Sequence, residues 1–178
     1  MTSVLKTGAN GSVTWLDPAE WALVHQDILA QCDTLDGVAD GIVEDPDLCT
    51  YRPIHLQCAP GNSTNCLTSA KVQTVEKVFS PLYGANGSLI FPRMQPGSEL
   101  SDAYIYYTGQ PFPYTVDWFR YAILNDSSWQ ATELNSYYAA VAAETDPWGI
   151  STWKGDLSGF QKRGGKMLHY HGQVCTLA

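Results

Sequence analysis

The segment between Cys32 and Cys49 has the residue types and spacing of a cation site. In a tight loop, its acidic residues and the residues alternating with them can turn three carboxylates and two backbone carbonyls toward one centre. These oxygens would come from Asp33, Asp36, Val38, Asp40 and Ile42. Five oxygens, two of them neutral, together with a bidentate carboxylate or a water, suit a hard and flexible ion such as calcium. The spacing therefore predicts a calcium loop over residues 32–49.

The same acidic segment has a simpler interpretation. Gly37 and Gly41 give the backbone the freedom that a tight wrap around an ion needs, but Asp-Gly pairs are also common turn formers, and acidic loops are often merely solvated. The spacing is not that of an EF-hand, because Val38 stands where that loop requires a side-chain oxygen and no Glu closes it. The residues alone leave both interpretations open.

The cysteines indicate local disulfides. Four of them, Cys32, Cys49, Cys58 and Cys66, allow three pairings, and the preference for short loops favours 32–49 and 58–66. On the loop-closure model the longer bridge would contribute roughly 3 kcal/mol to the free energy of unfolding. Cys175 is then left unpaired near the end of the sequence.

Asparagine sequons also indicate a secreted protein. Four Asn-x-Ser/Thr sequences with a non-proline middle residue are candidate glycosylation sites, at Asn10, Asn62, Asn86 and Asn125. Residues 1–15 contain no apolar stretch of the kind found in a signal peptide. We therefore expect secretion of a longer form, of which this sequence is a part.

Composition narrows the possible partners. The 178 residues suffice for one domain with a real core, and their formal net charge is −8. An acidic chain with few lysines is a poor candidate for binding nucleic acid or an anionic membrane surface. The sequence contains no run of 18 apolar residues. We expect neither a nucleic-acid nor a membrane partner.

Apolar periodicity predicts a mainly helical chain with short strands. A helix should begin at Asp17-Pro18 and end near Gln31, and a second should start after the cap Thr68 and stop before Pro81. A short strand should lie within residues 83–97. Further helices are expected over about 114–124, 131–143 and 156–163. Residues 166–172, ending in His171-Gly172, have the pattern of a buried strand whose neighbouring strands the chain does not supply.

Several motifs together resemble the tannase/feruloyl esterase family of α/β-hydrolases. Their residues are Trp21-Ala22-Leu23-Val24-His25, the run from Cys32 to Ile42, Cys66-Leu67-Thr68, Gln95-Pro96-Gly97-Ser98-Glu99, Ile150-Ser151-Thr152-Trp153, Gly155-Asp156-Leu157-Ser158-Gly159-Phe160, Arg163-Gly164-Gly165-Lys166-Met167 and Tyr170-His171-Gly172. The resemblance extends from about residue 15 to Gly172. It implies an α+β chain, with residues 1–150 as a lid domain and 151–178 as the beginning of the C-terminal α/β-hydrolase segment with one sheet strand.

The resemblance also implies ligands and substrates. A structural calcium would be held by the same five residues that the spacing selects. The lid would help to shape a pocket for the aromatic acyl group of a feruloyl or galloyl ester. Candidate contributors are Tyr114, Trp118, Phe119 and Trp129, for which the alternative role is ordinary lid core.

The resemblance does not supply a catalytic triad in this sequence. Members of the family use a Ser-His-Asp triad, with the serine in a Gly-Cys-Ser-x-Gly-Gly elbow, and no Gly-x-Ser-x-Gly occurs here. Cys175 stands where the aspartate of a His-Gly-x-x-Asp motif belongs. His169, on a buried-strand pattern, and His171 are expected in core or loop roles. We therefore name no catalytic residue.

Three functions compete on this basis. The first is a serine ester hydrolase of which the chain carries only a part, inactive by itself. The second is a calcium-stabilised remnant that binds an aromatic ligand without chemistry. The third is a translation product without function, which poor folding and an unpaired final strand would favour.

Overall fold

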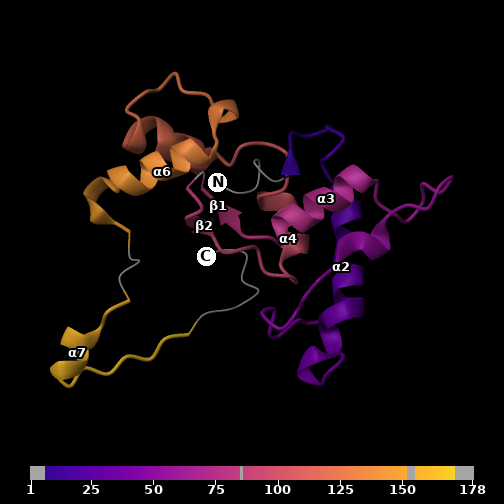
Figure 1. Ribbon diagram of the computed structural model, residues 1–178, viewed down its shortest axis with the longest axis horizontal. Coiled ribbons are helices and arrows are strands. Elements are labelled where there is room, and N and C mark those ends of the chain that lie inside the picture. Colours follow the sequence, from indigo (N-terminus) through magenta and orange to yellow (C-terminus); the bar gives the residue numbers. More distant parts are fainter. Residues whose placement is uncertain (1–6, 85, 152–154, 171–178) are drawn as a thin grey trace.

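A computed structural model describes residues 7–84, 86–151 and 155–170, and it shows a mainly helical chain with one small sheet (Figure 1). The α-helices are α2 (Pro18–Cys32), α3 (Ser69–Val78), α4 (Glu99–Ile105), α5 (Pro113–Asp117), α6 (Ser136–Thr145) and α7 (Ser158–Lys162). Short 3₁₀ turns span Asp33–Asp36, Pro53–Leu56, Ala131–Glu133 and Pro147–Gly149, and a π-helical turn spans Trp118–Ile123. The predicted α+β class is confirmed.

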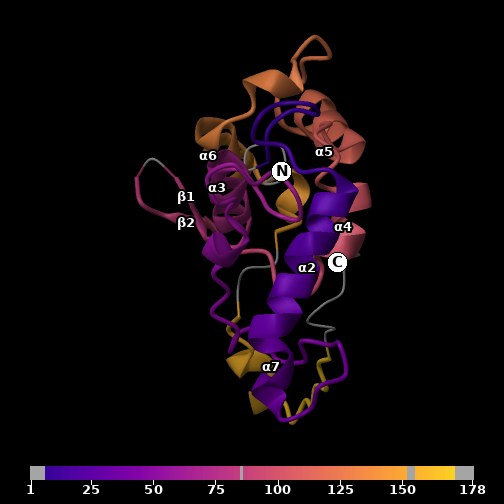
Figure 2. The ribbon, with the colours of Figure 1, turned by 90° about the vertical axis from the view of Figure 1, so that its right-hand side faces the viewer.

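Helix α2 begins where the sequence predicts. The Asp17 carboxylate accepts the Glu20 backbone N–H, the Glu20 carboxylate accepts that of Asp17, and Pro18 occupies the first turn. The buried face of the helix carries Trp21 and Val24. Because this face is apolar along its whole length, α2 is the central element of the core, and α4 and the 3₁₀ turn over Pro53–Leu56 pack against it (Figure 2).

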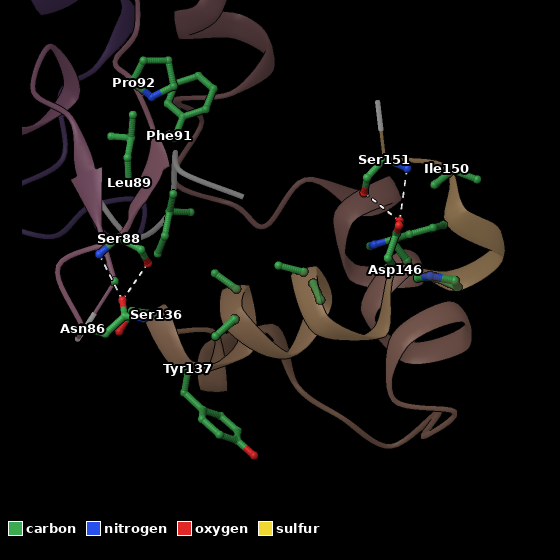
Figure 3. A pocket seen from close by; sticks show the side chains of 18 residues that line it. Asn86, Ser88, Leu89, Phe91, Pro92, Ser136, Tyr137, Asp146, Ile150 and Ser151 are labelled. Carbon is green, nitrogen blue, oxygen red and sulfur yellow. Dashed lines mark hydrogen bonds between the residues drawn. The ribbon is translucent and has the colours of Figure 1, made fainter. Parts of the chain in front are cut away.

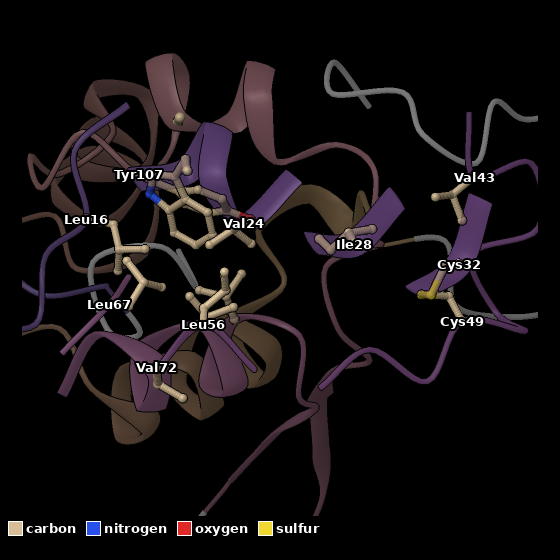
Figure 4. Packing of buried hydrophobic residues seen from close by; sticks show 14 residues of the cluster. Leu16, Val24, Ile28, Cys32, Val43, Cys49, Leu56, Leu67, Val72 and Tyr107 are labelled. Carbon is tan, nitrogen blue, oxygen red and sulfur yellow. A yellow bond between two sulfur atoms is a disulfide. The ribbon is translucent and has the colours of Figure 1, made fainter. Parts of the chain in front are cut away.

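Helix α3 also begins at its predicted cap. The Thr68 hydroxyl accepts the Lys71 backbone N–H, and Val72 and Val75 face the core. The Lys71 ammonium lies 2.5 Å from Glu20 Oε1, which joins the start of α3 to that of α2. Figure 4 shows the apolar core between them, with the Cys32–Cys49 disulfide at its far end.

The small sheet is a hairpin of β1 (Leu82–Tyr83) and β2 (Leu89–Phe91). The strands are antiparallel, and the turn closes through the Gly84 backbone N–H, which donates to the Ser88 carbonyl at 2.8 Å. The predicted short strand within 83–97 corresponds to β2. The hairpin lies between the core and α6 (Figure 1).

A second group of aromatic side chains holds the later elements together. Phe119 and Trp129 are buried and stacked, with ring centroids 5.3 Å apart, and Tyr138 of α6 packs edge-on against both. The predicted helix over 114–124 is therefore α5 continued by a π-helical turn, and the one over 131–143 is a 3₁₀ turn followed by α6.

The segment after α7 differs from expectation. Residues 166–170 form no strand, and Leu168 and Tyr170 are 92% and 91% exposed. A strand needs neighbouring strands to pair its backbone, and the hairpin offers none at that place (Figure 1). His169 is exposed and outside any helix or strand, which leaves the loop role of the two that were expected for it. His171, Gly172 and Cys175 lie outside the described residues.

Within the described ranges, no helix combines the length and the apolar character that crossing a membrane requires.

Candidate functional site

An apolar groove of about 980 Å³ lies between the hairpin and α6 (Figure 3). One wall comes from β2, with Leu89 and Phe91. The facing wall is a row of alanines on α6, where small side chains leave space, and Trp118 belongs to the lining as well. Such a concave, mostly apolar surface with few polar groups is the usual form of a small-molecule site.

The end of the groove is formed by the loop after α6. Asp146 accepts two hydrogen bonds through Oδ1, from the Ser151 backbone N–H at 3.1 Å and from the Ser151 hydroxyl at 2.7 Å (Figure 3). Asp146 and Trp148 both have positive φ, 29° and 61°. Positive φ in non-glycine residues is strained, and such strain gathers at functional sites.

The four aromatic residues predicted to shape an acyl pocket take different places. Trp118 lines the groove. Phe119 and Trp129 are buried in the aromatic core, which was the stated alternative. Tyr114 is 77% exposed and packs on Phe112 at 5.3 Å, away from the lining.

The groove also contains residues that the sequence did not single out, above all the alanines of α6 and the loop with Asp146. An alanine-rich helix gives no sign by itself of whether its small side chains pack closely or border a cavity. Of the residues that line the groove, only Trp118 had been predicted from the sequence to shape a pocket.

The predicted calcium loop is anchored at both ends in the core. Cys32, Val43 and Cys49 are at most 3% exposed. Between them, Gly37 and Gly41 adopt φ of 95° and 81°, as their predicted role in the wrap requires. The anchored ends fix where the loop leaves the core, while its middle lies at the surface.

Each of the three predicted aspartate ligands accepts a backbone N–H through Oδ1. Gly41 donates to Asp33 at 3.0 Å, which ties the two ends of the acidic run together. Asp36 accepts the Val38 backbone N–H at 2.8 Å, and Asp40 accepts the Ile42 backbone N–H at 3.1 Å. These are Asx turns, so the carboxylates order the loop as it stands.

The oxygen set of the loop has the chemistry of a calcium site, but its side chains are not gathered around one point. In the described part of the chain, no group of three or more His, Cys, Asp or Glu side chains is placed to hold a metal. Val38 and Ile42 are 55% and 56% exposed, and they could contribute only their backbone carbonyl oxygens, because their side chains carry none. Calcium at Asp33, Asp36, Val38, Asp40 and Ile42 therefore stays a prediction.

Both predicted disulfides are present. Cys32–Cys49 closes the acidic loop with Cα atoms 5.5 Å apart, and Cys58–Cys66 closes a short polar loop with Cα atoms 4.9 Å apart. The second bridge lies beside the backbone pairing of Gln57 with Leu67. The preference for short loops selected the correct pairing.

Two buried carboxylates on α4 were not expected. Glu99 is fully buried, pairs with His25 Nδ1 of α2, and accepts the Gly97 backbone N–H at 2.8 Å. Asp102, one turn further and also fully buried, accepts the Ser98 hydroxyl at 2.7 Å. Two acidic residues on the inward face of a short helix interrupt its apolar periodicity, so α4 was not predicted from the sequence.

Burial changes the protonation of this cluster. The pKa of Asp102 is raised to about 6, chiefly because burial disfavours the charged form. Hydrogen bonds from Ser98 and Tyr107 lower it in part, and the neighbouring charge of Glu99 raises it. The pKa of Tyr107 is itself raised by burial, so its hydroxyl stays a donor. The cluster ties α4 to α2, and none of its members lines the groove.

The sequons at Asn10, Asn62, Asn86 and Asn125 all lie at the surface. Asn86 forms the hairpin turn, where its Oδ1 accepts the Ser88 backbone N–H and hydroxyl (Figure 3). Their exposure is compatible with glycosylation, which stays a prediction.

A family model described as tannase and feruloyl esterase matches residues 2–175. A probable feruloyl esterase B-2 of Neosartorya fischeri is 52% identical over 168 residues, which are 93% of this chain and 32% of that protein. A probable feruloyl esterase B-1 of Aspergillus flavus is 50% identical over 172 residues, 96% of this chain and 33% of that protein. The chain thus spans about a third of the length of these curated relatives.

The chain is also similar to solved structures of a feruloyl esterase and a tannin acyl hydrolase. The crystal structure of feruloyl esterase B from Aspergillus oryzae matches with a TM-score of 0.92 at 49% identity, over 96% of this chain and 35% of that one. Tannin acyl hydrolase from Aspergillus niger matches with a TM-score of 0.71 over 97% of this chain and 36% of that one. At 18% identity, the second likeness shows the fold alone.

Proposed function

Because the chain belongs to the tannase and feruloyl esterase family, we propose that it is the lid part of a carboxylic ester hydrolase that acts on esters of aromatic acids, feruloyl or galloyl. The observation that carries the proposal is the apolar groove beside Trp118, in a chain about half identical to proteins named feruloyl esterases. A groove with apolar walls suits the ring of such an acid, since burying the ring removes apolar surface from water.

The chemistry would come from residues outside this chain. An ester is cleaved in such enzymes when a serine attacks the carbonyl, a histidine moves the proton and an aspartate orients the histidine. The sequence has no Gly-x-Ser-x-Gly elbow to present that serine. We therefore propose residues 1–150 as the lid and 151–178 as the beginning of the hydrolase segment, with no esterase activity in the chain alone.

The exposed segment after α7 supports this division. Met167, Leu168 and Tyr170 are 63%, 92% and 91% exposed. Adjacent apolar side chains of this size are rarely left in water without a partner surface. In the proposed enzyme, the sheet of the hydrolase domain would cover them.

Calcium would stabilise the lid and take no part in the reaction. The residues that would hold it are Asp33, Asp36, Val38, Asp40 and Ile42, and their oxygens are the ligands that calcium prefers. Calcium binding would require these carboxylates to break some of their present hydrogen bonds with the loop backbone.

The calcium proposal is tested by melting the purified chain with EDTA and with excess calcium. We expect a lower melting temperature in EDTA, and we expect Asp36→Asn to abolish the difference. Asp45→Asn is the matched control, since Asp45 lies in the same loop outside the ligand set and also accepts a backbone N–H, from Asp47 at 3.2 Å. Equal melting temperatures in EDTA and calcium would remove the metal from the proposal.

A second candidate function is binding of an aromatic ligand without turnover. The groove favours it, because its apolar lining from β2, α6 and Trp118 suits an aromatic ring and binding needs no catalytic group. The acidic loop and two disulfides would then stabilise a binding module.

Turnover distinguishes the two. The purified chain is incubated with methyl ferulate and methyl gallate, and acid release is followed by chromatography. We expect none from the chain alone, and we expect release from a longer form that supplies the serine elbow. Release by the chain alone would contradict the proposed division of the enzyme. A longer form that binds either ester and cleaves neither would favour the binding module.

Secretion and glycosylation are proposed with the enzyme. Expression through a eukaryotic secretory pathway should yield a product whose mass falls on treatment with an N-glycosidase. An unchanged mass would remove the four sequons from the proposal.

A further inference from the structure

Trp148 combines three features that do not serve the packing of the described chain. Its backbone has φ 61° and ψ 11°, a conformation that bulky side chains rarely adopt. Its side chain is 81% exposed. It directly follows Pro147, which lines the groove, and its indole lies 6.4 Å from that of Trp118. A strained residue that leaves a large apolar ring in water calls for an explanation outside the core.

The strain is imposed by a well-bonded loop. Asp146 binds the Ser151 backbone and hydroxyl, its own N–H donates to the Ala142 carbonyl at 3.1 Å, and the Gly149 N–H returns to the Asp146 carbonyl at 2.9 Å. These contacts fix the backbone on both sides of Trp148. The backbone of Trp148 is therefore held in one conformation by its own chain before any ligand arrives, which reduces the ordering cost of binding.

The two indoles offer a planar ligand two faces. Their ring planes are inclined by 59°, and the Trp118 indole borders the apolar lining. Aromatic rings gain from offset-stacked or edge-to-face contact beyond the area they bury. Trp148 itself lies just outside the groove lining, so a flat ring at that end of the groove could contact Trp118 and the exposed indole of Trp148 beside it.

We propose that Trp148 is a specificity-determining binding residue that contacts the aromatic ring of the ester. This inference rests on the proposed function, and it adds the residue that separates aromatic from aliphatic acyl groups. It also gives a preference in charge. The described lining includes the carboxylate of Asp146 and neither Lys nor Arg, so a neutral aromatic ester is bound more tightly than the free aromatic acid, whose carboxylate the site repels.

The test measures binding to the intact chain by isothermal titration near pH 6. The probes are methyl ferulate, the ferulate anion, and methyl 3-cyclohexylpropanoate as an apolar ester without an aromatic ring. We expect methyl ferulate to bind more tightly than the ferulate anion and more tightly than the saturated ester. Trp148→Ala should weaken methyl ferulate roughly five- to tenfold, the effect of losing one aromatic contact.

Two further variants control for folding and for exposed aromatic surface in general. Trp148→Gly relieves the positive φ, so its melting temperature should equal or exceed that of the wild type while the ligand affinity falls as in Trp148→Ala. Tyr104 on α4, 73% exposed and outside the groove lining, is the matched control, and Tyr104→Ala should bind methyl ferulate like the wild type.

Three results would overturn the inference: no binding of methyl ferulate by the wild-type chain, equal affinity in Trp148→Ala, or equal affinity for the saturated ester. The proposed function is scored separately in the longer enzyme. Absence of methyl ferulate hydrolysis there overturns that function, whereas hydrolysis with an unchanged KM in Trp148→Ala overturns only the role of Trp148.

Discussion

Helices α2 and α3 enclose their large apolar side chains and form, together with α4, the first region, whereas the chain from α6 onward leaves many of its own in solvent. Trp21 and Tyr107 are at most 2% exposed and in ring contact at 4.6 Å. Trp148 and Leu168, in the later region, are 81% and 92% exposed. The first region thus buries a core of its own, as an independent domain does. The second region exposes apolar side chains, as a contact surface does.

The likeness to feruloyl esterase B from Aspergillus oryzae gives this contrast a meaning. The match covers 96% of the present chain with a TM-score of 0.92, so the later region has a similar backbone path in a chain almost three times as long. Because the same backbone path occurs inside a longer protein, the exposed apolar side chains of the later region are placed where another part of such a protein could cover them. Four predictions test the contrast, in order of the expected effect.

The largest effect should come from Trp21. Its side chain is fully buried between α2 and Tyr107, so Trp21→Ala leaves a large cavity. We expect the free energy of unfolding to fall by about 3–5 kcal/mol, measured by denaturant titration. Trp148→Ala removes the same side chain from the second region and should cost less than about 0.5 kcal/mol. Similar losses in the two variants would erase the contrast between the regions.

The disulfides should come next. Replacing Cys32 and Cys49 together by alanine frees a loop with a sequence separation of 17 and should cost about 3 kcal/mol. The bridge between Cys58 and Cys66 closes a separation of only 8, so the matching double variant should lose somewhat less. Both losses are read from thermal unfolding under non-reducing conditions. A larger loss at 58–66 would show that the short polar loop, and not the acidic one, anchors the first region.

The buried carboxylate of Asp102 should make the first region sensitive to pH. Its pKa in the folded chain, about 6, exceeds the ordinary value of 3.8 for an aspartate, so folding favours the protonated form. The resulting stability is complete below pH 3.8 and is lost as the pH rises through 6. Between pH 4 and pH 6 this amounts to about 2 kcal/mol.

Asp102→Asn should flatten this pH dependence, because an amide of the same shape never ionises. The measurement is the unfolding free energy of both proteins at a series of pH values, taken as a difference so that titrating groups which do not interact with Asp102 cancel. Parallel curves for the two proteins would contradict the assignment.

The sequence predicted the parts of the molecule whose causes are local. Asp17 and Thr68 begin their helices because capping needs only residues within one turn. The disulfide pairing follows from short loops. The groove could not be predicted, because it depends on the distance between the hairpin and α6, to which Trp118 alone gave a clue.

Two failures have a shared physical reason. Helix α4 was missed because Glu99 and Asp102 occupy inward positions, and Glu99 finds its partner, His25, on α2 far away in the sequence. The strand over 166–172 was expected from its own pattern, but a strand exists only with neighbours. Long-range partners decide both cases, and no local pattern specifies them.

The smallest effect should come from the segment after α7. Leu168 is 92% exposed, so Leu168→Ser removes little buried area and should change the unfolding free energy of this chain by less than about 0.5 kcal/mol. Leu67, fully buried in the first region, is the matched position, and Leu67→Ala should cost about 2–5 kcal/mol. In the proposed longer enzyme the Leu168 side chain is covered by the hydrolase sheet, so the same Leu168→Ser variant should there become destabilising. A variant that is silent in the chain and costly in the longer enzyme would show that the open region is completed by that domain, whereas silence in both would leave its apolar side chains without a partner.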